Sequence, residues 1–256
     1  MPHGRRRCFV GPACAAFVGL ALAAPPAQAQ QNLFNVPSGK ITKSGDLFFQ
    51  QQFNITRPAG SSNTTFDFGL GNGFEAGFNV LDVVLYDRGS PSPVGRSQVN
   101  PDLLFNAQKG FELVDEVWNL GVGLQAGINP APRSRDVRFQ NFTWVINGFE
   151  LPDERGSVYV GAYYANVAYG GPGDRFGLML GTEIPVIKDV FHFQADYLSG
   201  ARDIGVGVVG GVFFLPGDWQ LSVGAQFPAF RSHNPYGVVL ELTLPSYPLF
   251  RRRGAE

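Results

Sequence analysis

The chain has 256 residues with 33 Gly and 23 Phe, only 16% charged residues and a formal net charge of −1. Soluble domains carry about 25% charged residues, so this composition argues against an ordinary soluble helical enzyme, and the charge balance lacks the basic surface of a nucleic-acid-binding protein. No stretch beyond the first 29 residues reaches the ~18 consecutive apolar residues of a membrane-spanning helix, which excludes a helical membrane protein.

Residues 1–29 have the three parts of a secretory signal peptide. Arg5 to Arg7 form a cationic start, Cys8 to Ala24 are mostly apolar, and Ala27 to Ala29 match the small-x-small cleavage rule. Cleavage there would remove both cysteines, Cys8 and Cys14, so no disulfide, thiolate nucleophile or cysteine metal site is expected in the exported chain. It would leave 17 basic against 21 acidic residues, a net charge of −4.

Three segments are expected after the signal peptide. Residues 30–45 are assigned to an N-terminal periplasmic segment, residues 46–250 to an outer-membrane β-barrel, and residues 251–256 to a basic C-terminal tail. Alternating apolar and polar residues dominate the middle segment. Phe74, Ala76 and Phe78, for example, alternate with Glu75 and Gly77. A period of two places successive side chains on opposite faces of a β-strand, whereas a helix would repeat every three to four residues.

The alternation predicts twelve strands, most of them close to the ~9–11 residues of a tilted transmembrane strand. We expect them at residues 46–55, 64–71, 73–82, 101–109, 118–129, 139–148, 156–166, 174–185, 189–199, 203–214, 218–227 and 235–244. No comparable amphipathic helix is present. The predicted fold is therefore all-β, a single antiparallel transmembrane β-barrel of about twelve strands.

The connections between strands provide a second test, because outer-membrane barrels have short periplasmic turns and longer outer loops. Asn72-Gly73 and Pro216 to Asp218 are turn sequences at predicted periplasmic joins. The join at residues 110–117 is longer than this rule expects. Longer joins rich in Pro, Ser and Gly are expected on the outer side, at residues 57–63, 86–100 and 129–138.

The composition of the two strand faces indicates which one meets lipid. The polar face holds mainly Gly, Gln, Asn, Ser and Thr, whereas a water-exposed exterior would carry many Lys and Glu. We therefore expect apolar residues outside and a polar lumen, rather than the reversed arrangement of a soluble lipid carrier. The expected lumen-lining set leans acidic: Asp67, Glu75, Asp102, Asn106, Glu183, His192, Gln194, Asp196, Gln220, Gln226 and Glu241.

Arginine is frequent in the predicted outer loops. A guanidinium group binds phosphate through a planar fork, so these residues could contact lipopolysaccharide or attract anionic solutes, although charged residues also favour loops in general. The expected rim contacts are Arg133, Arg135, Arg138 and Arg202.

Two hairpin sequences, Asn72 to Phe78 and Arg175 to Glu183, look like those of porin-like proteins sometimes grouped with phenol-degradation pathway barrels. More broadly, the exported chain resembles Gram-negative outer-membrane β-barrels. This resemblance implies insertion by the barrel-assembly machinery into the outer membrane. Such chains usually end on an aromatic residue, whereas here Leu244 or Phe250 could close the last strand before the basic tail.

Chemical motifs are scarce. Outer-membrane phospholipase A also has twelve strands, and His192 lies beside Gln194 and Asp196 on a polar face, but no serine lies two or four positions from it on that face. The remaining exported histidine, His233, is in a predicted loop, so neither a catalytic residue nor a metal or cofactor site is predicted. We expect a passive channel or transporter for small solutes. The alternatives are a closed structural or adhesin-like barrel and a lipid-modifying enzyme.

Overall fold

The computed structural model describes residues 32–88, 101–130 and 138–249. The expected signal peptide, the basic tail, Phe250, Arg133 and Arg135 lie outside the described residues.

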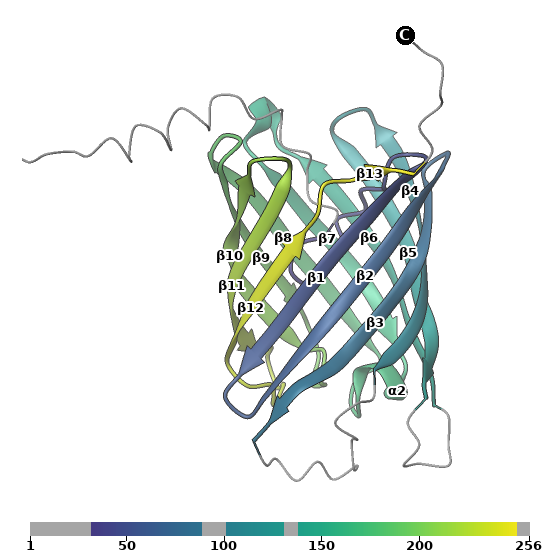
Figure 1. Ribbon diagram of the computed structural model, residues 1–256, viewed down its shortest axis with the longest axis vertical. Helices are drawn as coiled ribbons and strands as arrows, with labels where there is room; N and C mark the ends of the chain where they lie inside the picture. Colours follow the sequence, from purple (N-terminus) through teal and green to yellow (C-terminus); the bar gives the residue numbers. More distant parts are fainter. Residues whose placement is uncertain (1–31, 89–100, 131–137, 250–256) are drawn as a thin grey trace, which may run out of the picture.

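Within the described residues, twelve long strands form one antiparallel meander that closes when β12 pairs with β1, as Figure 1 shows. The strands are β1 Asp46–Thr56, β2 Ala59–Gly71, β3 Phe74–Asp87, β4 Asp102–Val114, β5 Trp118–Asn129, β6 Arg138–Glu150, β7 Ser157–Ala165, β8 Phe176–Ile187, β9 Phe191–Leu198, β10 Val206–Leu215, β11 Trp219–Pro228 and β12 Gly237–Thr243. The shorter elements are η1 Pro152–Glu154, α2 Val167–Gly170 and β13 Tyr247–Pro248.

The structure confirms the predicted fold class and the place of each of the twelve strands, but two connections differ from expectation. The outer join predicted at residues 57–63 is mostly strand, because Ser61 to Asn63 pair with β1 residues Gln52 to Asn54. The join at residues 110–117 is short after all, since β4 continues to Val114 and leaves three residues before Trp118. The first error arose because Ser61 to Asn63 have the polar composition of a loop, and the second because Gly110 and the acidic residues after it resemble a turn.

Exposure alternates along the strands. On β3, Phe74 and Phe78 are 49% and 59% exposed, whereas Glu75 and Asn79 on the other face are 8% and 2% exposed. Large apolar side chains therefore cover the outside of the barrel and polar ones are buried inside. This is the arrangement of a barrel that lies in lipid rather than in water.

The β12 strand ends at Thr243, before either expected end at Leu244 or Phe250. The short strand β13 follows it, and its Tyr247 and Pro248 pair with Leu47 and Asp46 at the start of β1. The seam between the first and last strands is thereby extended beyond the end of β12.

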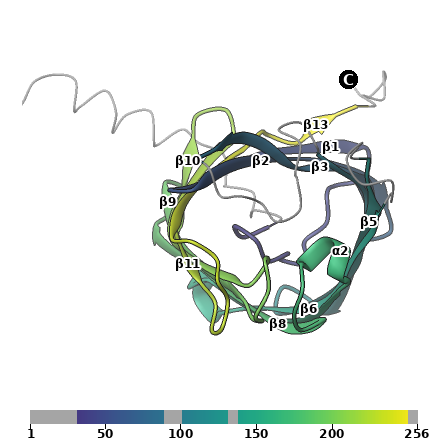
Figure 2. The ribbon, with the colours of Figure 1, turned by 90° about the horizontal axis from the view of Figure 1, so that it is seen from below.

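The chain that precedes β1 lies inside the ring of strands, where Figure 2 shows it in purple. Residues 32–42, called here the inner segment, include Leu33, Phe34 and Val36 at 3% exposure or less. The sequence placed residues 30–45 in the periplasm as a separate segment. In the structure, residues 32–42 lie within the ring of strands, because their apolar side chains are buried there, whereas Lys43 and Ser44 are exposed.

Candidate functional site: the barrel interior

The expected lumen-lining residues come together on the inner wall. Eight of the eleven are buried: Asp67, Glu75, Asn106, Glu183, Gln194, Asp196, Gln220 and Glu241. The other three, Asp102, His192 and Gln226, are half-buried. Of these, Asp102 accepts a hydrogen bond from Asn129, and Gln226 donates one to the Pro235 carbonyl at 3.1 Å.

The sequence reasoning left out other polar residues of the same wall. Gln50, Gln52, Asn79, Gln108, Gln140, Ser222 and Thr243 are also buried. All seven continue the alternation of their strands, so that signal was sufficient to find them. Among the described residues, the buried charged side chains are five carboxylates, those of Asp67, Glu75, Glu183, Asp196 and Glu241, and one guanidinium, that of Arg202.

Two wall carboxylates bind the backbone of the inner segment. Asp196 on β9 accepts hydrogen bonds from the backbone N–H groups of Asn35 and Val36, the latter at 3.0 Å. Glu75 on β3 accepts one from the Thr42 N–H at 2.7 Å and one from the Thr42 hydroxyl at 2.9 Å. Hydrogen bonds to an ionised acceptor contribute about 1.5–3 kcal/mol each, so these two carboxylates hold the segment at two separate places, Asn35–Val36 and Thr42.

Amide side chains of the wall bind backbone carbonyl groups of the segment as well. Gln52 donates to the Phe34 carbonyl at 2.6 Å, and Gln108 donates to the Lys40 carbonyl at 3.2 Å. The Lys40 ammonium lies 3.0 Å from the Glu150 carboxylate. Burial opposes the charge on Lys40, but Tyr159 and Glu150 outweigh it and raise its pKa above the ordinary value. Lys40 is therefore a cation at neutral pH and partly balances the acidic wall.

One part of the interior is apolar. Leu33 and Val36 pack against buried side chains of β6 to β9, namely Phe142, Trp144, Ile146, Tyr159, Tyr163, Ala165, Met179 and Leu198. Phe34 packs separately against Val208 and Val239. The sequence reasoning missed this apolar region. The sequence of β6 could have revealed this region, because both faces of the strand carry apolar residues: Phe139 and Val145 face outward, and Phe142 and Trp144 face inward.

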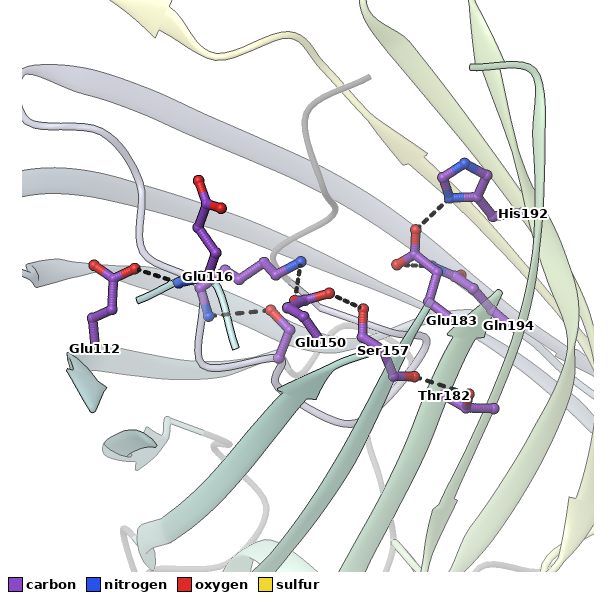
Figure 3. Close-up of polar contacts among 10 residues, drawn as sticks. Glu112, Glu116, Glu150, Ser157, Thr182, Glu183, His192 and Gln194 are labelled. Atoms are coloured by element: carbon purple, nitrogen blue, oxygen red, sulfur yellow. Dashed lines mark hydrogen bonds and ion pairs between the residues drawn. The ribbon is translucent and has the colours of Figure 1, made fainter. Parts of the chain in front are cut away.

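His192 belongs to a polar cluster on the same wall, which Figure 3 shows around Glu183. Its Nδ1 lies 2.6 Å from one Glu183 oxygen, and Gln194 donates to the other oxygen at 3.3 Å. The imidazole ring also meets the Phe214 ring edge-on, with centroids 4.6 Å apart. Both contacts fix the orientation of His192 in the wall.

A cleft of about 360 Å³ opens between the inner segment and the turn that joins β4 to β5. Lys40 and Ile41 line it from the segment, Glu116 lines it from the turn, and Glu112 and Trp118 line it from the adjoining ends of β4 and β5. The cleft is therefore a mixed acidic and apolar surface at the end of the barrel where the inner segment leads into β1.

The structure separates the expected rim arginines. Arg138 is exposed at the start of β6. Arg202 is 4% exposed, because the connection between β9 and β10 packs it beneath α2. Its Nη1 donates to the Ala165 carbonyl at 3.3 Å, and its guanidinium lies 5.7 Å from the centre of the Tyr163 ring. Arg202 is thus part of the interior and not of an exposed rim.

Comparison with known proteins found a match among solved structures but none among family models or curated sequences. A solved structure, an outer-membrane channel from Pseudomonas putida F1, matches with a TM-score of 0.51 and 14% sequence identity, over 78% of this chain and 94% of that chain. In the described ranges, no helix is long and apolar enough to cross a membrane. The chain therefore has the fold of a closed twelve-stranded barrel, a fold that it shares with an outer-membrane channel.

Proposed function

We propose that this protein is an outer-membrane channel for small solutes. The observation that carries the proposal is the buried polar wall, because a barrel that served only as a membrane anchor would need no large set of carboxylates and amides facing its lumen. The fold shared with an outer-membrane channel of P. putida F1 supports the same function.

The exposed apolar exterior supports placement in the outer membrane, reached by export through a cleaved signal peptide at residues 1–29. The joins at residues 72–73, 115–117, 188–190 and 216–218 are short and lie at one end, which we assign to the periplasm. The opposite end has most of the longer joins, among them the one that contains α2, although only Arg57 and Pro58 join β1 to β2 there. Exposed Arg138 at that end is the described residue that we propose for lipopolysaccharide contact. Insertion would require the barrel-assembly machinery.

The test is conductance of the purified protein in planar lipid bilayers, together with solute uptake into proteoliposomes. We expect ion conductance, because a polar lumen holds water. A protein that neither conducts nor admits solutes, both intact and without residues 32–42, would favour the runner-up, a closed structural barrel. That alternative draws support from the inner segment, which occupies the lumen.

We propose a transport role rather than a catalytic one. His192 lies between a carboxylate and an aromatic ring, and such contacts suit a fixed residue of the wall. Phospholipase activity of the wild-type protein that the His192→Ala variant loses would overturn this part of the proposal. His233→Ala is the matched control, because this histidine lies in the connection between β11 and β12.

A further inference from the structure

We infer that the inner segment is a displaceable plug over an acidic lumen, and that the channel selects small cations when the plug leaves. This inference rests on the proposed channel function. It adds which part of the chain closes the pore and which class of solute the open pore accepts.

The barrel does not depend on the inner segment for its strand ladder. The ring of twelve strands is closed by the pairing of β1 with β12. Residues 32–45 form two isolated β-bridges. One joins Asn32 to Pro37 within the inner segment, and the other joins Ser44, which follows the segment, to Gly69 of β2. Residues 32–42 otherwise contact the wall through hydrogen bonds of their backbone to wall side chains and through packing of their own side chains. They can therefore leave the lumen while every strand keeps both of its neighbours.

The docked segment supplies positive partners to the acidic wall. Its N–H groups bind Asp196 and Glu75, and its Lys40 pairs with Glu150. When the segment leaves, these carboxylates lose the donors that it provides. The guanidinium of Arg202 stays behind, bound to the Ala165 carbonyl beneath α2.

The charge balance of the lumen then decides the solute class. Five buried carboxylates remain against one guanidinium among the described residues. Charge of one sign in a narrow aqueous passage concentrates ions of the opposite sign and repels others. The open pore should therefore pass small inorganic and organic cations in preference to anions.

A reversible cross-link tests the plug directly. A Cβ atom added at Gly181 would lie 2.2 Å from a terminal carbon of Leu33, so Leu33→Cys combined with Gly181→Cys places two thiols side by side. Both natural cysteines precede residue 30 and are absent from the chain after cleavage of the signal peptide. We expect the oxidised protein to conduct less than the reduced protein, and the two single-cysteine variants to show no effect of reductant.

Ion selectivity is measured on a variant that lacks residues 32–42. Heat-modifiable migration on a denaturing gel first shows that this variant is folded. In a KCl gradient, its zero-current potential should move toward the Nernst potential of K⁺. Asp196→Asn combined with Glu75→Gln in this background should reduce that shift.

Each outcome supports or overturns one statement. Equal conductance of the oxidised and reduced double-cysteine protein would overturn the plug and leave the channel standing. A zero-current potential that moves toward the Nernst potential of Cl⁻ would overturn cation selectivity. If the folded deletion variant and every other form fail to conduct, the proposed channel function itself is wrong.

Discussion

Replacement of Leu33 by Ala should loosen the inner segment by a calculable amount. The Leu33 side chain is 1% exposed and packs into the apolar cluster of β6 to β9. Truncation of a buried Leu to Ala costs about 2–5 kcal/mol. Since ~1.4 kcal/mol corresponds to a tenfold change in an equilibrium constant, the ratio of displaced to docked segment should rise by about 30-fold or more. The barrel ladder contains no residue of the segment and should remain intact.

Hydrogen exchange measures this ratio, because the exchange of a protected amide follows the population of the open form. The Val36 and Thr42 amides are the reporters, since wall carboxylates accept their hydrogen bonds when the segment is docked. Both should exchange about 30-fold or more faster in Leu33→Ala than in the wild type. The matched control is Leu70→Ala, which removes the same atoms from a 64% exposed position on the outer face. Equal exchange of Val36 and Thr42 in the two variants would refute the reasoning.

Three further predictions concern the barrel itself. The unheated protein should migrate differently from the boiled protein on a denaturing gel, and identical migration would contradict a closed barrel. Gly73→Ala should lower the melting temperature more than Gly217→Ala: both positions have positive φ, but a Cβ at Gly73 would lie 2.6 Å from the Gly110 carbonyl oxygen, whereas Gly217 has no atom nearer than 3.6 Å. Lys188→Met should leave the melting temperature nearly unchanged, because the Lys188–Glu154 pair is highly exposed. The hydrogen bond from Lys188 lowers the pKa of Glu154, so any small contribution exists at neutral pH and disappears as the pH falls through that pKa. A large loss at neutral pH would contradict this estimate.

The fold could be predicted from sequence because every strand carries the same local signal. Phe74, Glu75 and their neighbours alternate strictly, and Asn72-Gly73 marks the turn before them. The signal failed where polar residues occupy consecutive positions, because the alternation of apolar and polar residues is then lost. Ser61 to Asn63 have the composition of a loop, yet they pair along β1.

The interior was only partly predictable, because two of its features depend on contacts between distant parts of the chain. Residues 32–42 have no strand periodicity, and only the apolar trio Leu33, Phe34 and Val36 hinted at burial. Arg202 follows a strand and reads as a loop residue. Its burial depends on α2 folding over it, and the local sequence around position 202 does not predict that contact.

The path of the inner segment also constrains the order of folding. Val36 lies 160 residues before Asp196 in the chain, and Phe34 packs against Val208 and Val239 on later strands still. Contacts of such long sequence separation form late, because a large loop must close before they can be made. The first described residues of the chain must therefore wait for the last strands. Until then their burial site is incomplete, so the apolar side chains of Leu33, Phe34 and Val36 stay exposed until the barrel closes.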